Sequence, residues 1–174
     1  MNFYDFKKGI SFHDVVLKAE KEGFTEPDPK IDLSGVDVAR KILILARESG
    51  YNLELNSIKN NSFLPNDCLK TKTKSDFYNS LKINELHFIE LLKNAEKQNS
   101  RLKYIAQLEK GKASVGLQKI QPDHDFYNLE GSDNIILFYT KRYNKQPLIV
   151  KGAGAGAEVT AGGIFGDIIR IGKK

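Results

Sequence analysis

The chain has 174 residues, enough for one domain with a buried core, and its hydrophobic fraction of 40% is ordinary for a folded domain. Its net charge of +5 comes from scattered lysines without interleaved stacking aromatic residues, which disfavours a nucleic-acid partner. No apolar run approaches the roughly 20 residues that span a bilayer, and residues 1–9 lack the apolar stretch of a secretory signal, so no membrane partner is expected.

Apolar spacing predicts two helices within the first 50 residues. In residues 11–23 apolar side chains recur at helical intervals, Ser11 can cap the start of the helix, and Gly23 can end it. A second amphipathic helix is predicted over residues 35–50, with Ser34 as its cap.

The segment that joins these helices is proline-rich and acidic. Residues 24–35 read FTEPDPKIDLSG. Pro27 and Pro29 each push the preceding residue out of the helical region, and neither can donate a backbone hydrogen bond. The segment is therefore predicted to be a stiff loop without regular structure.

The middle of the chain changes from helical to strand periodicity. A strand with loops is predicted over residues 51–65, and one or two helices over residues 74–98. Alternating apolar residues on both sides of Gly111 predict a β-hairpin in residues 101–120. The predicted apolar stripe of the helical part consists of Leu86, Ile89, Leu92 and Ala95.

Two further strands and a final helix complete the prediction. Residues 133–141 and 146–152 are largely apolar and are expected to be buried strands, followed by a glycine-rich turn and a helix. The element order predicts an α+β fold: a sheet of about four to five strands with helices packed on it, plus a C-terminal helix.

The other reactive side chains of the sequence indicate no chemistry of their own. His13, His87 and His124 are too widely separated to form a metal-ligand motif. Cys68 is the single cysteine, so an intrachain disulfide is excluded and a reducing, cytoplasmic location is expected, with Cys68 in a loop. Ser34 has no nearby histidine and is better explained as a helix cap than as a nucleophile.

The most informative pair is Asp37 and Lys41, which share one face of the second predicted helix. Glu26, Asp28 and Asp32 come from the stiff loop just before it, and together these residues could form a pocket in which acids face one ammonium group. Such a pair is usually an ordinary surface ion pair. A rigid neighbouring loop favours a site, because catalytic groups must be held within about 0.5 Å, and both interpretations stay open on the residues alone.

A long stretch of sequence resembles a known enzyme family. Residues 19–41, AEKEGFTEPDPKIDLSGVDVARK, closely resemble the signature of homoserine dehydrogenases. The resemblance covers essentially the whole chain and is weakest over residues 56–100. Within the signature, Lys30-Ile31 stand where the family commonly has Arg-Asp. The resemblance implies reversible hydride transfer between NAD(P)H and L-aspartate 4-semialdehyde, giving L-homoserine.

The resemblance also implies roles for individual residues. Lys41 matches the lysine held to exchange a proton with the substrate oxygen, and Asp37 matches the aspartate that binds substrate and orients that chemistry. Glu26 matches the glutamate that holds the substrate ammonium, and Asp32 an acid lining the same pocket. An ammonium at Lys41 can protonate the alkoxide that forms as hydride arrives, so residue chemistry and resemblance agree.

The glycine-rich segment GAGAGA at residues 152–157 formally satisfies a dinucleotide-binding pattern. Too few residues follow Gly156 for the second strand and its acid, so a self-contained site is not expected. In the family, positions matching Gly23 and Gly156 approach the nicotinamide cofactor. Gly162, Gly163 and Gly166 fall within the last predicted helix, where each glycine costs about 0.5–1 kcal/mol relative to alanine. This cost predicts close backbone packing against another element or against a cofactor.

The resemblance further predicts the organisation of the chain. Residues 1–151 match the catalytic, substrate-binding and dimerisation domain, and residues 152–174 match the tail that completes an N-terminal nucleotide-binding domain not found here. We therefore expect a fragment that is inactive alone, needs NADP or NAD held by the missing domain, and forms a homodimer. The alternative is a non-catalytic oligomerisation module that keeps an idle pocket.

Overall fold

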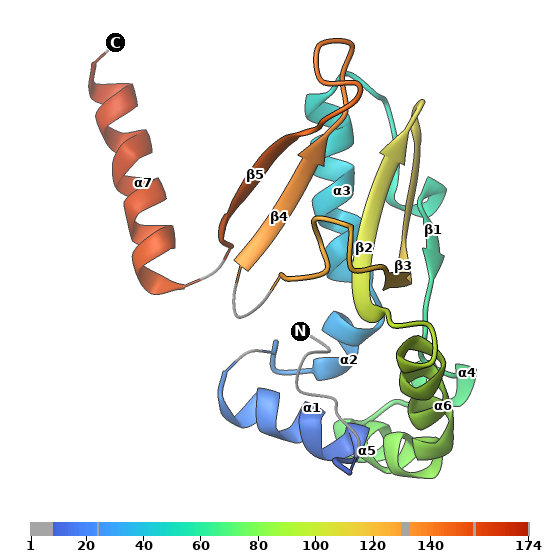
Figure 1. Cartoon of the computed structure of the whole chain (residues 1–174). Coiled ribbons are helices and arrows are strands. Elements are labelled where there is room, and N and C mark those ends of the chain that lie inside the picture. The colour runs from blue at the N-terminus through green and yellow to red at the C-terminus, as the bar shows by residue number, and fades with distance from the viewer. Residues whose placement is uncertain (1–8, 24, 130–132, 155, 174) are drawn as a thin grey trace. The chain divides into compact units, whose positions relative to one another are not determined.

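The computed structural model describes residues 9–23, 25–129, 133–154 and 156–173 (Figure 1). The N-terminal stretch without a secretory signal lies almost wholly outside these residues. The chain divides into two compact units, Met1–Tyr127 and Asn128–Lys174. No helix in the described residues is long and apolar enough to cross a membrane.

The first unit contains helices and three strands. Its helices are α1 (Phe12–Lys21), α2 (Pro29–Leu33), α3 (Val36–Glu48), α4 (Asn66–Leu69), α5 (Lys74–Ile83) and α6 (Glu85–Glu96), with a short 3₁₀ turn at Leu55–Ser57. Its strands are β1 (Lys59–Asn61), β2 (Arg101–Glu109) and β3 (Lys112–Ile120). The second unit contains β4 (Asp133–Phe138), β5 (Leu148–Ala153) and α7 (Ala157–Gly172).

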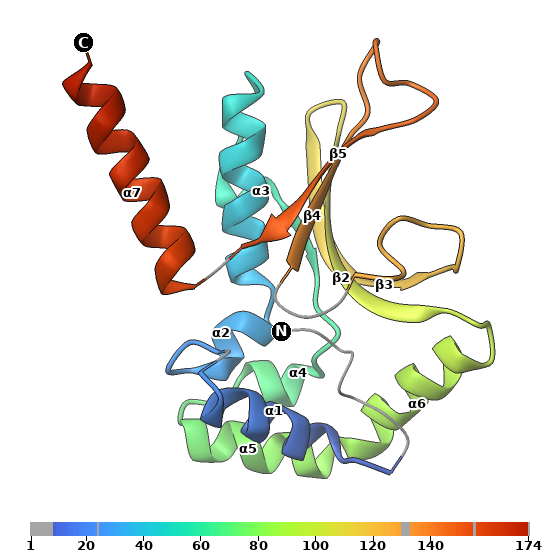
Figure 2. The same ribbon diagram turned by 60° about the vertical axis from the view of Figure 1, so that its left-hand side comes forward.

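One hydrophobic cluster joins α1, α4, α5 and α6, which lie together in both views of the ribbon (Figure 2). The rings of Phe12 and Phe88 stack with centroids 4.3 Å apart, and the Phe63 ring meets Phe12 edge-on. Phe77 and Leu81 of α5 are fully buried in the same cluster. These large side chains supply most of the apolar area removed from water, which is the main force that holds the helices together.

A second cluster packs α3 against a three-stranded sheet of order β1-β3-β2. β2 and β3 pair antiparallel and β1 pairs parallel with β3. Lys110 and Gly111 both have positive φ, 49° and 76°, which suits the two-residue turn between Glu109 and Lys112 and confirms the predicted hairpin. α3 presents its apolar face, Ala39, Ile42 and Ala46, to the interior.

The second unit has regular elements but no buried residue among those described. β4 and β5 pair antiparallel, with Leu137 opposite Ile149, so the predicted strands are confirmed. Their predicted burial is wrong within this unit: β4 is at most half-buried and every residue of β5 is exposed. A two-stranded ribbon offers no second layer against which both faces can pack. α7 confirms the predicted final helix, and each of its described residues is exposed.

Three other local predictions are corrected. Residues 29–33 form the single helical turn α2 and not an irregular loop. Pro29 is tolerated there because it stands at the first helical position, where a missing N–H is not needed. Cys68 is buried within the short helix α4 and not in a loop. The predicted stripe of α6 is wrong only at Leu86, which is 75% exposed. Ala95 is buried, Ile89 and Leu92 are partly buried against the same cluster, and Phe88 is the buried residue that the prediction missed.

The α+β class predicted from the sequence is confirmed. The strands of the described residues form a three-stranded sheet in the first unit and a two-stranded sheet in the second. The segment predicted as a strand over residues 51–65 contributes only β1, whose three residues are exposed.

Candidate functional site

The predicted Asp37–Lys41 pair forms on α3. Lys41 Nζ lies 2.9 Å from Asp37 Oδ2, and the two side chains are 64% and 40% exposed. Because Ala39, Ile42 and Ala46 are buried on another side of the same helix, the pair is carried by an anchored element and faces solvent. An ammonium group has three donors, so Lys41 can hold Asp37 and still donate to a ligand.

The acidic segment before α3 is shaped by its own carboxylates. Asp28 caps α2, since its Oδ1 accepts a hydrogen bond from the backbone N–H of Lys30 at 3.0 Å. Asp32 Oδ2 accepts from the backbone N–H of Glu26 at 2.9 Å. These two hydrogen bonds fold the segment back on itself. The Glu26 side chain takes part in neither of them.

The same segment is fastened to the helical core. Pro29 and Leu33 are buried, and Lys30 Nζ donates to the carbonyl oxygen of Thr71 at 2.6 Å. The Thr25 hydroxyl is buried without a hydrogen-bond partner in the described residues.

The structure brings the predicted residues together in two groups. Asp37 and Lys41 form one, and Glu26 and Asp32 form the other. α2 packs against α3, so the two groups belong to neighbouring elements of one unit. The single pocket in which these four residues and Asp28 face one ligand stays a prediction, because within the described residues no hydrogen bond or ion pair joins the two groups.

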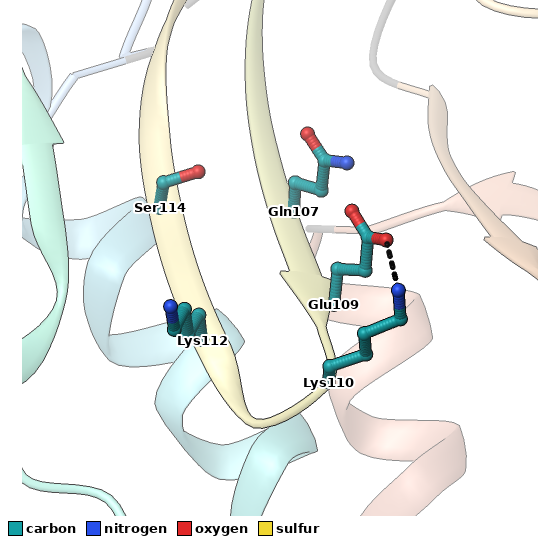
Figure 3. A pocket seen from close by; sticks show the side chains of 5 residues that line it. All are labelled: Gln107, Glu109, Lys110, Lys112 and Ser114. Atoms are coloured by element: carbon teal, nitrogen blue, oxygen red, sulfur yellow. Dashed lines mark ion pairs between the residues drawn. The ribbon is translucent and has the colours of Figure 1, made fainter.

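Two shallow hollows lie on the first unit. One, of about 270 Å³, is lined by side chains of α2, α3 and α4, among them Lys30, Ser34 and Arg40. The other, of about 350 Å³, lies at the tip of the β2–β3 hairpin, and Figure 3 shows its polar lining, in which Lys110 pairs with Glu109 at 3.8 Å. Neither hollow is lined by Glu26, Asp32, Asp37 or Lys41, the residues predicted to act on substrate.

The two predicted cofactor-contacting glycines both need their special backbone. Gly23, which follows the last turn of α1, has φ +75°, and Gly156, which precedes α7, has φ +130°. A side-chain carbon would meet no atom within 4 Å at either position. Both backbones are therefore open to close approach by a ligand. α7 has no side-chain cap at its start, so the amide groups there suit the phosphates of a dinucleotide.

The remaining glycines of the tail differ from one another. A side-chain carbon at Gly154 would lie 1.3 Å from Asn134 Nδ2, so a larger residue there would displace the Asn134 side chain within the second unit. At Gly162, Gly163 and Gly166 nothing lies within 4 Å. The neighbour predicted for these three positions is not found within the described residues, and it stays a prediction.

The histidines and the cysteine have structural contacts. His13 Nδ1 lies 2.9 Å from Asp14 Oδ1, and His87 Nε2 lies 2.8 Å from the carbonyl oxygen of Phe63. Burial raises the pKa of the Cys68 thiol, which disfavours the reactive thiolate. No group of three or more metal-ligating side chains is found in the part of the chain that the structure describes.

Sequence reasoning missed the residues that hold the start of α3. Ser34 was predicted to cap this helix, but its hydroxyl donates to the carbonyl of Ile31, and the capping position is Gly35 at φ +81°. Asn60 and Tyr104 lie over Gly35. The sequence signal was a glycine directly before a helix, but its two partners are distant in the chain.

Comparison with known proteins decides the family. The family model for homoserine dehydrogenase matches residues 2–169. This chain belongs to the homoserine dehydrogenase family. It is 49% identical over 172 residues to a bifunctional aspartokinase/homoserine dehydrogenase from Zea mays, covering 97% of this chain and 19% of that protein. It is 40% identical over 168 residues to the homoserine dehydrogenase of Saccharomyces cerevisiae, covering 95% of this chain and 46% of that protein.

Solved structures share the fold of this chain. A crystal structure of a Candida auris protein of unknown function superposes with a TM-score of 0.87 at 40% identity, covering 97% of this chain and 48% of that one. A Staphylococcus aureus homoserine dehydrogenase shares the fold at a TM-score of 0.69 and 24% identity, with 95% and 38% coverage. The chain thus spans about a fifth of the length of the plant relatives and less than half of the yeast relative.

Proposed function

We propose that this chain is the substrate-binding and proton-transferring part of a homoserine dehydrogenase. The reaction is the reversible NAD(P)-dependent reduction of L-aspartate 4-semialdehyde to L-homoserine. The observation that carries the proposal is the Asp37–Lys41 pair, a solvent-facing acid and ammonium 2.9 Å apart on a helix anchored by its opposite side. Membership of the homoserine dehydrogenase family supports this reaction.

In this proposal Lys41 moves the proton. Its Nζ donates to the carbonyl oxygen of the semialdehyde as that oxygen becomes a hydroxyl, and accepts the proton back in the reverse direction. Asp37 accepts one of the three ammonium hydrogen bonds, which fixes the direction of the others and keeps the side chain extended toward substrate. Asp37 also contacts the substrate directly.

Glu26 and Asp32 recognise the amino-acid end of the substrate. Carboxylates bind an ammonium group through short charge-assisted hydrogen bonds. The backbone of Glu26 is held by Asp32 Oδ2, so its side chain is presented from a fixed point, and the second oxygen of Asp32 stays available.

Gly23 and Gly156 are proposed to approach the cofactor, and their open, positive-φ backbones support this assignment. NADPH or NADH supplies the hydride when it is bound. We propose residues 1–151 as the catalytic domain and residues 152–174 as the part that completes a nucleotide-binding domain carried elsewhere in the polypeptide or on a partner. The isolated chain is then expected to show no turnover.

A homodimer is also proposed. The exposed apolar side chains of β5, Leu148, Ile149 and Val150, support an association surface, since such residues are more often covered than left in water. The same observation favours the second candidate function, an oligomerisation module with an idle pocket. Sedimentation of the chain tests the dimer, and only the activity assay below separates the two functions.

The decisive experiment joins this chain to the N-terminal part of the S. cerevisiae relative, replacing that protein's matching region. NADPH oxidation with L-aspartate 4-semialdehyde is then measured for the parent chimera and for Lys41→Ala. We expect kcat to fall by at least about 100-fold, as for loss of a positioned acid–base group. Lys18→Ala is the matched control, because Lys18 pairs with Glu22 at the same spacing and is 63% exposed.

Near-parental turnover by Lys41→Ala would overturn the role of Lys41. An inactive parent chimera that is folded and binds NADPH would favour the oligomerisation module. Clear turnover by the isolated chain would contradict the proposed need for a separate nucleotide-binding domain.

A further inference from the structure

The start of α3 is held from outside the helix. Its capping residue Gly35 has φ +81° and provides no side-chain hydrogen bond, while Ser34 directs its hydroxyl backward to Ile31. The first backbone bond of the helix, from the Ala39 N–H to the Gly35 carbonyl, is 2.9 Å long. Helix starts without a side-chain cap fray more readily, so other groups must fix this turn.

Two side chains from distant strands supply the missing support. Asn60 of β1 donates from Nδ2 to the Ser34 carbonyl oxygen at 2.8 Å. Tyr104 of β2 donates its hydroxyl to Asn60 Oδ1 at 3.0 Å. A side-chain carbon at position 35 would lie 2.0 Å from that hydroxyl oxygen, so the tyrosine rests directly on Gly35. Only glycine satisfies both the positive φ and this close approach.

The supporting side chains are themselves fixed. The Tyr104 ring packs against both hydrophobic clusters of the first unit and meets the Phe63 ring edge-on with centroids 6.1 Å apart. Burial raises the pKa of Tyr104, so its hydroxyl keeps the proton that it donates. Asn60 is held by β1, where it pairs in register with Val115 of β3. Asn60 and Tyr104 thus fix the turn at Gly35 to both the sheet and the helical core.

This support acts two residues before Asp37. We propose that Asn60 and Tyr104 are positioning residues that fix the first turn of α3, and through it the direction in which Asp37 and Lys41 are presented to substrate. The inference rests on the proposed function of that pair. A displacement of about 1 Å in a reacting group can cost up to about 100-fold in rate, so a loosened helix start lowers kcat without touching substrate.

The test uses the same chimera. Tyr104→Phe removes only the hydroxyl and keeps the ring in both clusters, while Asn60→Asp keeps the acceptor for Tyr104 but removes the donor to Ser34. Each is expected to lower kcat about 10-fold or more, with KM changed by less than about twofold. Tyr51→Phe is the matched control; this 40% exposed tyrosine packs against Gly111 at the hairpin turn.

Two measurements separate positioning from general stability. Because both groups act through one turn, the double variant Tyr104→Phe/Asn60→Asp should be no slower than the slower single variant. Hydrogen exchange of the Ala39 amide should accelerate in both single variants, while exchange in α5 stays unchanged.

The proposal is overturned if both variants keep kcat within twofold of the control, or if the Ala39 amide exchanges at the parental rate. It is also overturned if activity falls only in proportion to unfolded protein. Full activity of Lys41→Ala would instead contradict the proposed function of the Asp37–Lys41 pair, so the failure of one proposal can be told from the failure of the other.

Discussion

The two units contain equally regular secondary structure but differ in what they bury. The first unit encloses two hydrophobic clusters, with Phe12, Phe77 and Leu81 fully removed from water. In the second, β5 and α7 expose every described side chain, including Phe165 at 65% and Ile171 at 73%. The residues of the two units are comparably apolar. An apolar strand or helix is therefore predictable from composition, but whether another element packs over its apolar face is not.

This difference indicates where each unit gets its stability. The first unit gains it from its own apolar burial, at about 25 cal/mol for each Å² removed from water. The second unit gains little from burial within its own residues and relies on backbone pairing between β4 and β5. An isolated two-stranded hairpin is marginal in water, so the second unit needs a covering surface for full stability.

The largest expected effect comes from emptying the core of the first unit. Phe77→Ala should lower the free energy of unfolding by about 3–5 kcal/mol, because it removes a fully buried ring and leaves a cavity. Phe165→Ala in α7 should change it by no more than about 0.5 kcal/mol. Urea unfolding followed by circular dichroism measures both.

If Phe77→Ala does not fold, Phe77→Leu should give a smaller, measurable loss in the free energy of unfolding. Equal effects of the two alanine variants would show that α7 is buried in solution and would remove the contrast between the units.

A second prediction concerns glycines. Gly35→Ala should destabilise the first unit by about 1–3 kcal/mol or more, because it combines a positive φ with an overlap onto the Tyr104 hydroxyl. Gly163→Ala, where nothing lies within 4 Å, should have the opposite sign and stabilise α7 by about 0.5–1 kcal/mol. Thermal melting followed by circular dichroism reports both changes.

Adding Tyr104→Phe to Gly35→Ala should restore part of the lost stability, because the overlapping hydroxyl oxygen is then gone. A destabilising Gly163→Ala would indicate that a neighbour covers α7.

The smallest expected effect is electrostatic. The hydrogen bonds that Glu20 accepts from Lys74 and Tyr78, together with the charge of Lys74, hold its pKa below the ordinary value of 4.5. A carboxylate with a lowered folded-state pKa stabilises the fold above its unfolded pKa and loses that contribution as the pH falls through the folded pKa. The parent should therefore be more stable than Glu20→Gln at pH 7, and the difference should shrink below about pH 4.5.

Paired urea titrations at several pH values measure this difference. The matched control is Asp167→Asn in α7, whose ion pair with Arg170 is largely exposed and should contribute about 0–1 kcal/mol. The prediction would be contradicted if the difference in unfolding free energy between the parent and Glu20→Gln grew as the pH fell.

Part of the candidate site could be predicted from local spacing. The four-residue interval between Asp37 and Lys41 requires only a helix, and the 2.9 Å pair confirms that they share a face. The family signature supplied the roles proposed for Glu26 and Asp32. The turn before α3 could not be predicted in the same way, because Gly35 is held by Asn60 and Tyr104, which follow it by many residues.

The sequence by itself determined the helical periodicity of α1 and α3, the α+β class, the β2–β3 hairpin and the family. These depend on residues close together in the chain, where side-chain spacing and turn geometry act directly. Only the tertiary structure decided that Pro29 begins a helix, that Gly35 replaces Ser34 as a cap, and that β5 is exposed within its unit. Burial and hydrogen bonding to distant segments set these outcomes, and neither is encoded in local spacing.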